Sequence, residues 1–239
     1  MRARGFEIEF LSHALSILSV DFPAALSEIE AVLADASVSV GEIVGSGGGE
    51  AASTQRMRRA LAARGWAKKN FIIRKIVDGV EREATSHQID HVKKFENGTL
   101  ALEIEWNNKD PFFDRDLENF KRLHGEGAIS VGIIVTRGAS LQNALRPAIL
   151  RFAVDHQIRT FDDLATLGII PTARQRREIE RRAAAGRSFG DAWASHFVSD
   201  KFGESTTHWR KLQDRVRRGV GNPCPLLLIG LSDRAIAVE

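Results

Sequence analysis

Three acidic residues around one tight turn constrain the fold of this chain more than any other feature. Asn97-Gly98 is a strong signal for a two-residue hairpin turn, because both residues tolerate the positive φ that such turns require. Pairing the flanking strands from Glu96 opposite Thr99 places Asp90 opposite Glu105. We therefore predict an antiparallel hairpin with facing carboxylates.

The side chains of Asp90, Glu103 and Glu105 fall on one face of this hairpin, because successive strand residues point to opposite sides. A pairing shifted by two residues would put Asp90 opposite Glu103 and would leave all three on that face. Facing carboxylates repel one another by up to about 1 kcal/mol, which a bound cation would offset. The pattern indicates a metal site; the alternative is three solvated acids on an exposed sheet face.

The composition is that of an ordinary globular protein, with 43% hydrophobic and 27% charged residues among 239. The single cysteine, Cys224, excludes an internal disulfide framework and suits a reducing compartment. No apolar run approaches the roughly 20 residues of a membrane span, and Glu7 and Glu9 interrupt any signal-peptide core. We expect a soluble, cytoplasmic protein with one domain over residues 1–239.

Positive charge is concentrated late in the chain. Residues 171–220 hold twelve Lys/Arg against six Asp/Glu, whereas the net charge of the whole chain is only +3. Such asymmetry suggests a polyanion partner at one surface. A solvated helix with internal ion pairs explains it equally well, since the charges alternate over residues 176–182.

Strand and helix signals alternate along the sequence and predict an α/β fold with a mixed central sheet flanked by helices. Helical spacing covers residues 10–18, 23–33 and 55–64, and a further helix begins at Asp110-Pro111. Strands are predicted at Val38–Val44, in a hairpin across Asp78-Gly79, at Ser130–Thr136 and at Leu226–Leu231, with a loop at Gly45–Gly49. The apolar run Ser130–Thr136 is typical of a buried central strand.

Longer strings around the acidic residues carry a family resemblance. Ile89-Asp90, Glu103–Leu117 and Ile133–Gly138 resemble the BglII/BstYI type II restriction endonucleases. Ser205–Trp209 and Gly221–Leu226 are similar to the same family. The likeness thus runs from about Phe6 to Gly230, and the Glu103–Leu117 string makes it specific.

This resemblance implies a restriction-endonuclease-like core, a homodimer, Mg²⁺ as cofactor, and cleavage of double-stranded DNA at a short palindrome with a GATC centre. In the wider PD-(D/E)xK nucleases the third active-site residue is usually lysine. Glu105 stands there in this sequence, and the Glu-x-Glu form is similar to that of BamHI. Two roles are open for Glu105: activating the water or helping to hold a second ion.

The chemistry of phosphodiester hydrolysis agrees with this interpretation. Mg²⁺ is held in proteins by one or two carboxylates together with waters and substrate phosphate. We assign Asp90 and Glu103 as metal ligands, and these two with Glu105 as the catalytic residues. Asn70, upstream of Asp90, is an auxiliary candidate near the metal.

DNA contacts are expected from residues that follow the predicted strands. Asn107, Asn108 and Lys109 directly follow the acidic strand, and their side chains suit base edges or phosphates. A competing role for this segment is turn formation and helix capping, with Asp110 as N-cap. The other DNA-contact candidates are Arg137, Ser140, Thr206, Thr207, His208 and Trp209, the last with a core role as its alternative.

The sequence therefore predicts a Mg²⁺-dependent type II restriction endonuclease. One alternative is a sequence-specific DNA-binding protein that retains the fold without cleavage. Another is a repair nuclease of low sequence specificity. The intact set of carboxylates argues against a pure binder, because acidic groups that face phosphate weaken DNA binding.

Overall fold

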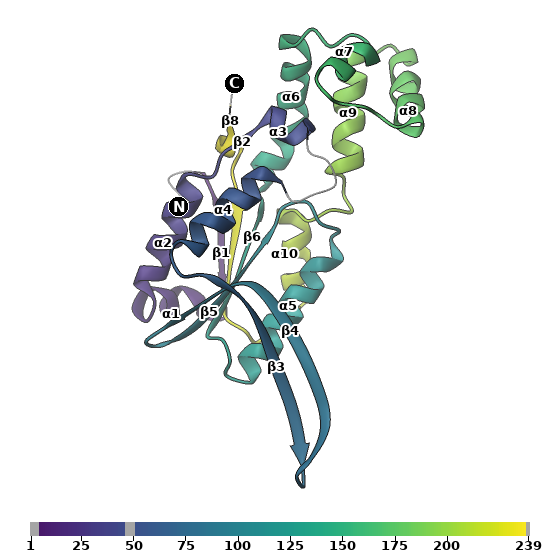
Figure 1. Cartoon of the computed structure of the whole chain (residues 1–239). Coiled ribbons are helices and arrows are strands. Elements are labelled where there is room, and N and C mark those ends of the chain that lie inside the picture. Colours follow the sequence, from purple (N-terminus) through teal and green to yellow (C-terminus); the bar gives the residue numbers. More distant parts are fainter. Residues whose placement is uncertain (1–4, 46–50, 238–239) are drawn as a thin grey trace.

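A six-stranded mixed β-sheet runs through the molecule, and helices cover both of its faces (Figure 1). The structure is a computed structural model that describes residues 5–45 and 51–237. In spatial order the strands are β1 (Glu7–Leu11), β7 (Leu226–Leu231), β6 (Val131–Arg137), β5 (Gly98–Glu105), β4 (Val80–Phe95) and β3 (Ala67–Val77). The central strands β5, β6 and β7 are parallel, whereas β1, β3 and β4 pair antiparallel. The predicted α/β class with a mixed central sheet is confirmed.

The helices divide between the two faces of the sheet. One face is covered by α1 (Ala14–Val20), α2 (Pro23–Ala34), α4 (Ala52–Ala62) and α6 (Ala139–Asp155), and the other by α5 (Pro111–Gly125) and α10 (Trp209–Arg217). Four shorter or peripheral helices are α3 (Val40–Gly45), α7 (Phe161–Thr166), α8 (Ala173–Ala184) and α9 (Phe189–Lys201). A two-stranded sheet joins β2 (Val38–Ser39) to β8 (Ile236–Ala237), which follows the 3-10 turn η2 (Asp233–Ala235). None of the helices that the structure describes is long and apolar enough to cross a membrane.

Strand alternation produces a separate hydrophobic core on each face of the sheet. On β5, Leu100 and Leu102 pack toward α1, α2 and α6, while Ala101 packs toward α5 and α10. The continuous apolar sequence of β6 is explained because both of its faces are buried. Glu103 and Glu105 follow Ala101 on the face of α5, where the core gives way to a cavity.

The β4–β5 hairpin forms as predicted, but with the register shifted by two residues. Phe95 pairs with Gly98, so the turn is Glu96-Asn97, and the ladder runs back to His91 opposite Leu102, next to Asp90 and Glu103. The predicted pairing of Glu96 with Thr99 is therefore wrong. Tertiary contacts fix the observed turn: Phe95 packs against Phe22 and Trp66.

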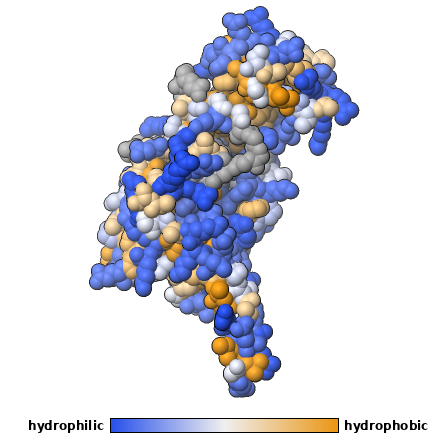
Figure 2. All heavy atoms as spheres, in the orientation of Figure 1, coloured by the Kyte–Doolittle hydropathy of each residue, from blue (hydrophilic) through white to orange (hydrophobic). Residues whose placement is uncertain are grey.

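Beyond the body of the molecule, β3 and β4 continue as a two-stranded ribbon that ends at Asp78-Gly79, as the sequence predicted (Figure 1). Figure 2 shows apolar side chains on this projection, where Ile72, Ile76 and Val80 are 51–62% exposed. At the base of the ribbon, the strand pairing advances by two residues along β3 but by three residues along β4. The extra residue forms a β-bulge that includes Asp90, and bulges of this kind redirect side chains near active sites.

Two local predictions are wrong. Residues 10–18 are not one helix, because Phe10 and Leu11 belong to β1, and Ser12 and His13 then adopt positive φ before α1 begins. Val38–Val44 is not one strand either, because the chain turns into α3 at Val40. The predicted loop Gly45–Gly49 falls outside the described residues except for Gly45, which ends α3.

Candidate active site

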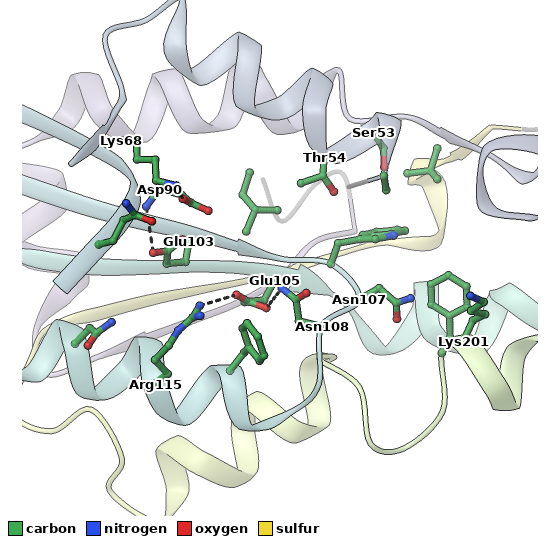
Figure 3. Close-up of a pocket in the computed structure, with 18 of the residues that line it drawn as sticks. Ser53, Thr54, Lys68, Asp90, Glu103, Glu105, Asn107, Asn108, Arg115 and Lys201 are labelled. Atoms are coloured by element: carbon green, nitrogen blue, oxygen red, sulfur yellow. Dashed lines mark hydrogen bonds and ion pairs between the residues drawn. The ribbon is translucent and has the colours of Figure 1, made fainter. Parts of the chain in front are cut away.

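A polar cavity of about 820 Å³ opens beside β4 and β5, between α4 and α5 (Figure 3). Asp90 comes from β4, Glu103 and Glu105 come from β5, and all three line this cavity. Lys68 on β3 and Arg115 on α5 bring positive charge to the same space. The structure thus gathers the three predicted catalytic residues around one cavity, and Lys201 lines it as a third cation (Figure 3).

Glu103 is 4% exposed, and its Oε1 accepts a hydrogen bond from the backbone N–H of Asp90 at 3.2 Å. Burial raises the pKa of Glu103 to about 9, and the like charges of Asp116 and Asp90 add to this rise. None of the ion pairs among the described residues includes Glu103. Asp90 is more exposed and lies 3.4 Å from the Lys68 ammonium.

Glu105 is buried and has a neighbour at each carboxylate oxygen. Asn108 Nδ2 donates to Oε2 at 2.7 Å, and Arg115 Nη2 lies 3.7 Å from Oε1. Burial and the like charge of Asp116 raise the pKa of Glu105 to about 8, whereas the Asn108 hydrogen bond acts in the opposite direction. The side chain is held in place at the end of its strand.

Asp116 is a further buried carboxylate, beside Glu105, that the sequence analysis missed. It is 1% exposed, its Oδ1 accepts from Arg115, and its carboxyl interacts with that of Glu105, while Oδ2 accepts from no donor among the described residues. A signal was present in the sequence: Asp116 shares helical spacing with Phe113, Leu117 and Phe120, which places an acid on the apolar face of α5. Burial raises the pKa of Asp116, and Arg115 opposes that rise.

The donor chemistry of this site suits a hard divalent cation, although the ligands are not assembled as a cage. Within residues 5–45 and 51–237, no group of three His, Cys, Asp or Glu side chains could by itself hold a metal ion. The charge of Asp90 nevertheless acts on Glu103, whose carboxylate accepts from the Asp90 backbone N–H, and none of the described residues forms an ion pair with Glu103. Two carboxylates completed by waters and phosphate are the usual protein ligands of Mg²⁺, so these residues fit such an ion.

Asn107, Asn108 and Lys109 leave β5 at the edge of the cavity. Asn107 and Asn108 line it, and the Asn107 Oδ1 atom has no hydrogen-bond partner. Lys109 is exposed, and its backbone forms an isolated antiparallel β-bridge with Thr206. Asp110 occupies the N-cap position of α5 as predicted but makes no side-chain capping bond; its Oδ2 accepts from Arg215 at 2.9 Å.

Arg137 is fully buried, so in this structure it cannot touch DNA as predicted. Its Nε donates to the Trp106 carbonyl at 2.7 Å, and its Nη2 donates to the Thr206 hydroxyl at 2.7 Å and the Thr207 carbonyl at 2.6 Å. Burial lowers the pKa of Arg137 to about 9. Arg137 therefore ties the loop after β5 to the segment before α10.

Thr207 and His208 are also buried, for the same reason: they form the segment that Arg137 holds. Thr207 Oγ1 accepts from the Asn108 backbone N–H at 3.1 Å. Burial lowers the pKa of His208 to about 4. Both residues lie behind the loop after β5, where they support it.

Three further candidates lie away from the cavity lining. Ser140 begins α6, where its hydroxyl accepts from the Asp233 backbone N–H at 3.2 Å. Asn70 is exposed on β3 opposite Gln88. Trp209 is 7% exposed within the core under α10, so its core role is confirmed.

Ion pairs partly neutralise the basic stretch 171–220. The pairs of Glu178 with Arg181 and Arg182 confirm the internal ion pairing that was the alternative to a polyanion partner. The pairs join Arg181 and Arg182 to Glu178, Arg187 to Asp191, Arg210 to Glu204, and Arg215 to Asp110 and Asp114.

Comparison with known proteins gives one match that spans the fold just described. Residues 6–231 match the family described as restriction endonuclease BglII/BglIII, a range that runs from β1 to β7 and includes Asp90, Glu103, Glu105 and Asp116. No curated protein sequence matches the chain. Restriction endonucleases bind double-stranded DNA and hydrolyse it at specific sites, typically with a metal ion, which agrees with an acidic cavity on the sheet. The chain therefore belongs to the BglII/BglIII family of restriction endonucleases.

Proposed function

We propose that the protein cuts both strands of DNA at a short palindrome centred on GATC, as a Mg²⁺-dependent type II restriction endonuclease. The observation that carries the proposal is the pair of buried carboxylates, Glu103 and Glu105, that face one polar cavity with Asp90. Burying two acids beside each other is unfavourable, and Glu103 has no ion pair among the described residues, so a site that retains them has a use for them. The GATC centre is supported by the resemblance of the Glu103–Leu117 segment to the BglII/BstYI type II restriction endonucleases.

The side chains of the site divide the chemistry among them. Asp90 and Glu103 would hold Mg²⁺, which when bound supplies charge neutralisation and lowers the pKa of a water. Glu105, fixed by Asn108, would orient the attacking water or accept its proton. The water oxygen then bonds to phosphorus, one P–O ester bond breaks, and the leaving oxygen takes a proton from solvent.

Sequence readout is proposed for the loop that follows β5. Asn107 and Asn108 line the cavity and carry amides of the kind that bind adenine in the major groove. Lys109, exposed beside them, suits guanine or a phosphate. The loop therefore offers polar groups next to the carboxylates.

Plasmid digestion with Mg²⁺, followed by sequencing of the product ends, tests the proposed function. We expect ends with 5′ overhangs that contain GATC. Glu103→Ala should abolish cleavage while affinity for the same DNA in Ca²⁺ stays within a few-fold, because the variant loses a ligand but no contact to DNA. Glu96→Ala, which removes an exposed acid from the turn of the same hairpin, is the matched control and should cleave normally.

Other results identify the alternative functions. Specific binding without cleavage by the unaltered protein would indicate a DNA-binding protein that has lost catalysis. Cleavage with no shared sequence at the ends would indicate a repair nuclease. Full activity in Glu103→Ala would remove the acidic site from the mechanism.

A further inference from the structure

We infer that Arg115 is a catalytic residue that binds a non-bridging oxygen of the phosphate to be cleaved, and that Asp116 positions its guanidinium. The inference rests on the proposed function. It starts from the location of Arg115, which begins on α5 and extends toward Glu105 from the wall opposite α4 (Figure 3).

The guanidinium of Arg115 is fixed along one edge and on one face. Its Nε and Nη2 atoms each lie 2.8 Å from Asp116 Oδ1, and its central carbon lies 4.4 Å from the centre of the Phe112 ring. A planar group held in this way loses little freedom when it binds a ligand, which is how arginine achieves directional recognition of phosphate.

Donor capacity remains on this guanidinium after these contacts are counted. Nη1 makes no hydrogen bond to the residues that the structure describes, and the 3.7 Å separation of Nη2 from Glu105 Oε1 is too long for one. The Arg115 side chain is 54% exposed and lines the cavity. N–H groups are therefore available to an oxyanion beside Glu105.

A purely structural role for Arg115 explains less. If Arg115 only neutralised Asp116, the whole ion pair including the guanidinium could be buried. An apolar residue at position 116 would then stabilise the fold at least as well as the pair. Instead, a wholly buried carboxylate beside Glu105 holds a cation that opens into the cavity. Of the other two cations that line the cavity, Lys68 and Lys201, the first is already paired with Asp90.

During hydrolysis, negative charge grows on the non-bridging oxygens while water bonds to phosphorus and the ester bond breaks. Fixed cationic donors aimed at those oxygens stabilise the transition state more than the ground state. Arg115 would donate hydrogen bonds and would transfer no proton.

The test compares Arg115→Gln with Arg122→Gln. Arg122 lies on the same helix, is similarly exposed and paired with an acid, and is absent from the cavity lining, so it is a matched control. We expect Arg115→Gln to lower the single-turnover cleavage rate about a hundredfold. It should also reduce the salt slope of DNA binding in Ca²⁺ by about 1, the signature of one lost phosphate contact. Arg115→Lys should restore part of the rate, and Arg122→Gln should change neither quantity.

Variants of Asp116 test its positioning role. Asp116→Asn keeps an oxygen acceptor for Arg115 and should retain most of the rate, whereas Asp116→Ala should not. Because Asp116 acts through Arg115, the double variant Arg115→Gln/Asp116→Ala should be no more than a few-fold slower than Arg115→Gln alone. Multiplicative losses would mean that Asp116 supports the fold or Glu105 independently.

A normal cleavage rate and salt slope in a folded Arg115→Gln protein, verified by its thermal unfolding midpoint, would overturn the inference. If the unaltered protein cuts no DNA, the proposed function fails instead. The phosphate contact of Arg115 is then judged by the salt slope alone, which needs no cleavage.

Discussion

Among single residues, Glu103 is a carboxylate whose surroundings differ strongly from water. It is almost wholly buried, it faces Asp90 and Asp116, and no cation pairs with it among the described residues. Its folded, metal-free state therefore favours the protonated carboxyl, and a bound cation reverses that preference.

This preference makes the stability of the metal-free protein depend on pH. Because the pKa of Glu103 is raised from 4.5 to about 9, the folded protein keeps a proton between these values that the unfolded chain releases. The unfolding free energy should therefore fall as pH rises through this window, by up to about 1.4 kcal/mol per pH unit from this group. Urea unfolding in EDTA at pH 6, 7 and 8 should show a steeper fall for the unaltered protein than for Glu103→Gln. Parallel curves would contradict the proton uptake.

Asn108 supports a second residue-scale prediction, because it combines a cavity position with a hydrogen bond to Glu105. If its amide reads a base when DNA is bound, Asn108→Ala should lower discrimination against a changed base pair by about 1–3 kcal/mol. Non-specific affinity should stay nearly constant. Affinities for cognate and altered DNA at several salt concentrations measure both; an equal loss on the two DNAs would restrict Asn108 to holding Glu105.

Among the elements, the β4–β5 hairpin depends on Gly98. Its φ is +148°, and a Cβ atom there would lie 2.2 Å from Ser130 Oγ. We expect Gly98→Ala to destabilise the protein by about 1–3 kcal/mol in chemical denaturation. Gly79→Ala is the matched control at the other hairpin turn, where φ is also positive but nothing lies within 4 Å of the added atom. Equal losses would show that the contact with Ser130 is unimportant.

Local patterns predicted the elements whose partners are near in sequence. The two hairpins follow from Asp78-Gly79 and Asn97-Gly98, and side-chain alternation correctly grouped Asp90 with Glu103 and Glu105 despite the shifted register. The shift depends on Phe22 and Trp66, which no pattern within the hairpin reveals.

Elements with distant partners were harder to predict. Phe10 lies in a strand because it pairs with Leu227, more than two hundred residues later. Arg137 reads as a DNA contact in the sequence, but its partners Trp106 and Thr207 come from other segments and enclose it. The same reasoning applies to Arg115, whose importance emerges only when α5 packs beside β5.

For the whole molecule, the acidic cavity beside β4 and β5 leads to a prediction about assembly. A palindrome presents the same sequence on both strands, so two copies related by a twofold axis would place one cavity at each strand. We expect a homodimer with both cavities facing a common DNA channel, and with basic walls drawn partly from residues 171–220. Light scattering should give twice the mass of 26.4 kDa, and supercoiled plasmid should become linear without accumulating nicked circles. A monomer on DNA that only nicks would contradict this assembly.

The order of the strands also bears on when the protein becomes active during its synthesis. β7 is the last of the six strands in the chain, yet it lies between β1 and β6. Thr206 and Thr207, which accept hydrogen bonds from Arg137, are synthesised only shortly before β7. A ribosome that has released the chain only as far as α9 has therefore produced all the carboxylates of the cavity but not the parts that complete the sheet and secure the acidic loop. At about 5–20 residues per second, the rest follows within a few seconds. Until then the nascent chain carries the residues proposed to cut DNA without the scaffold that aligns them.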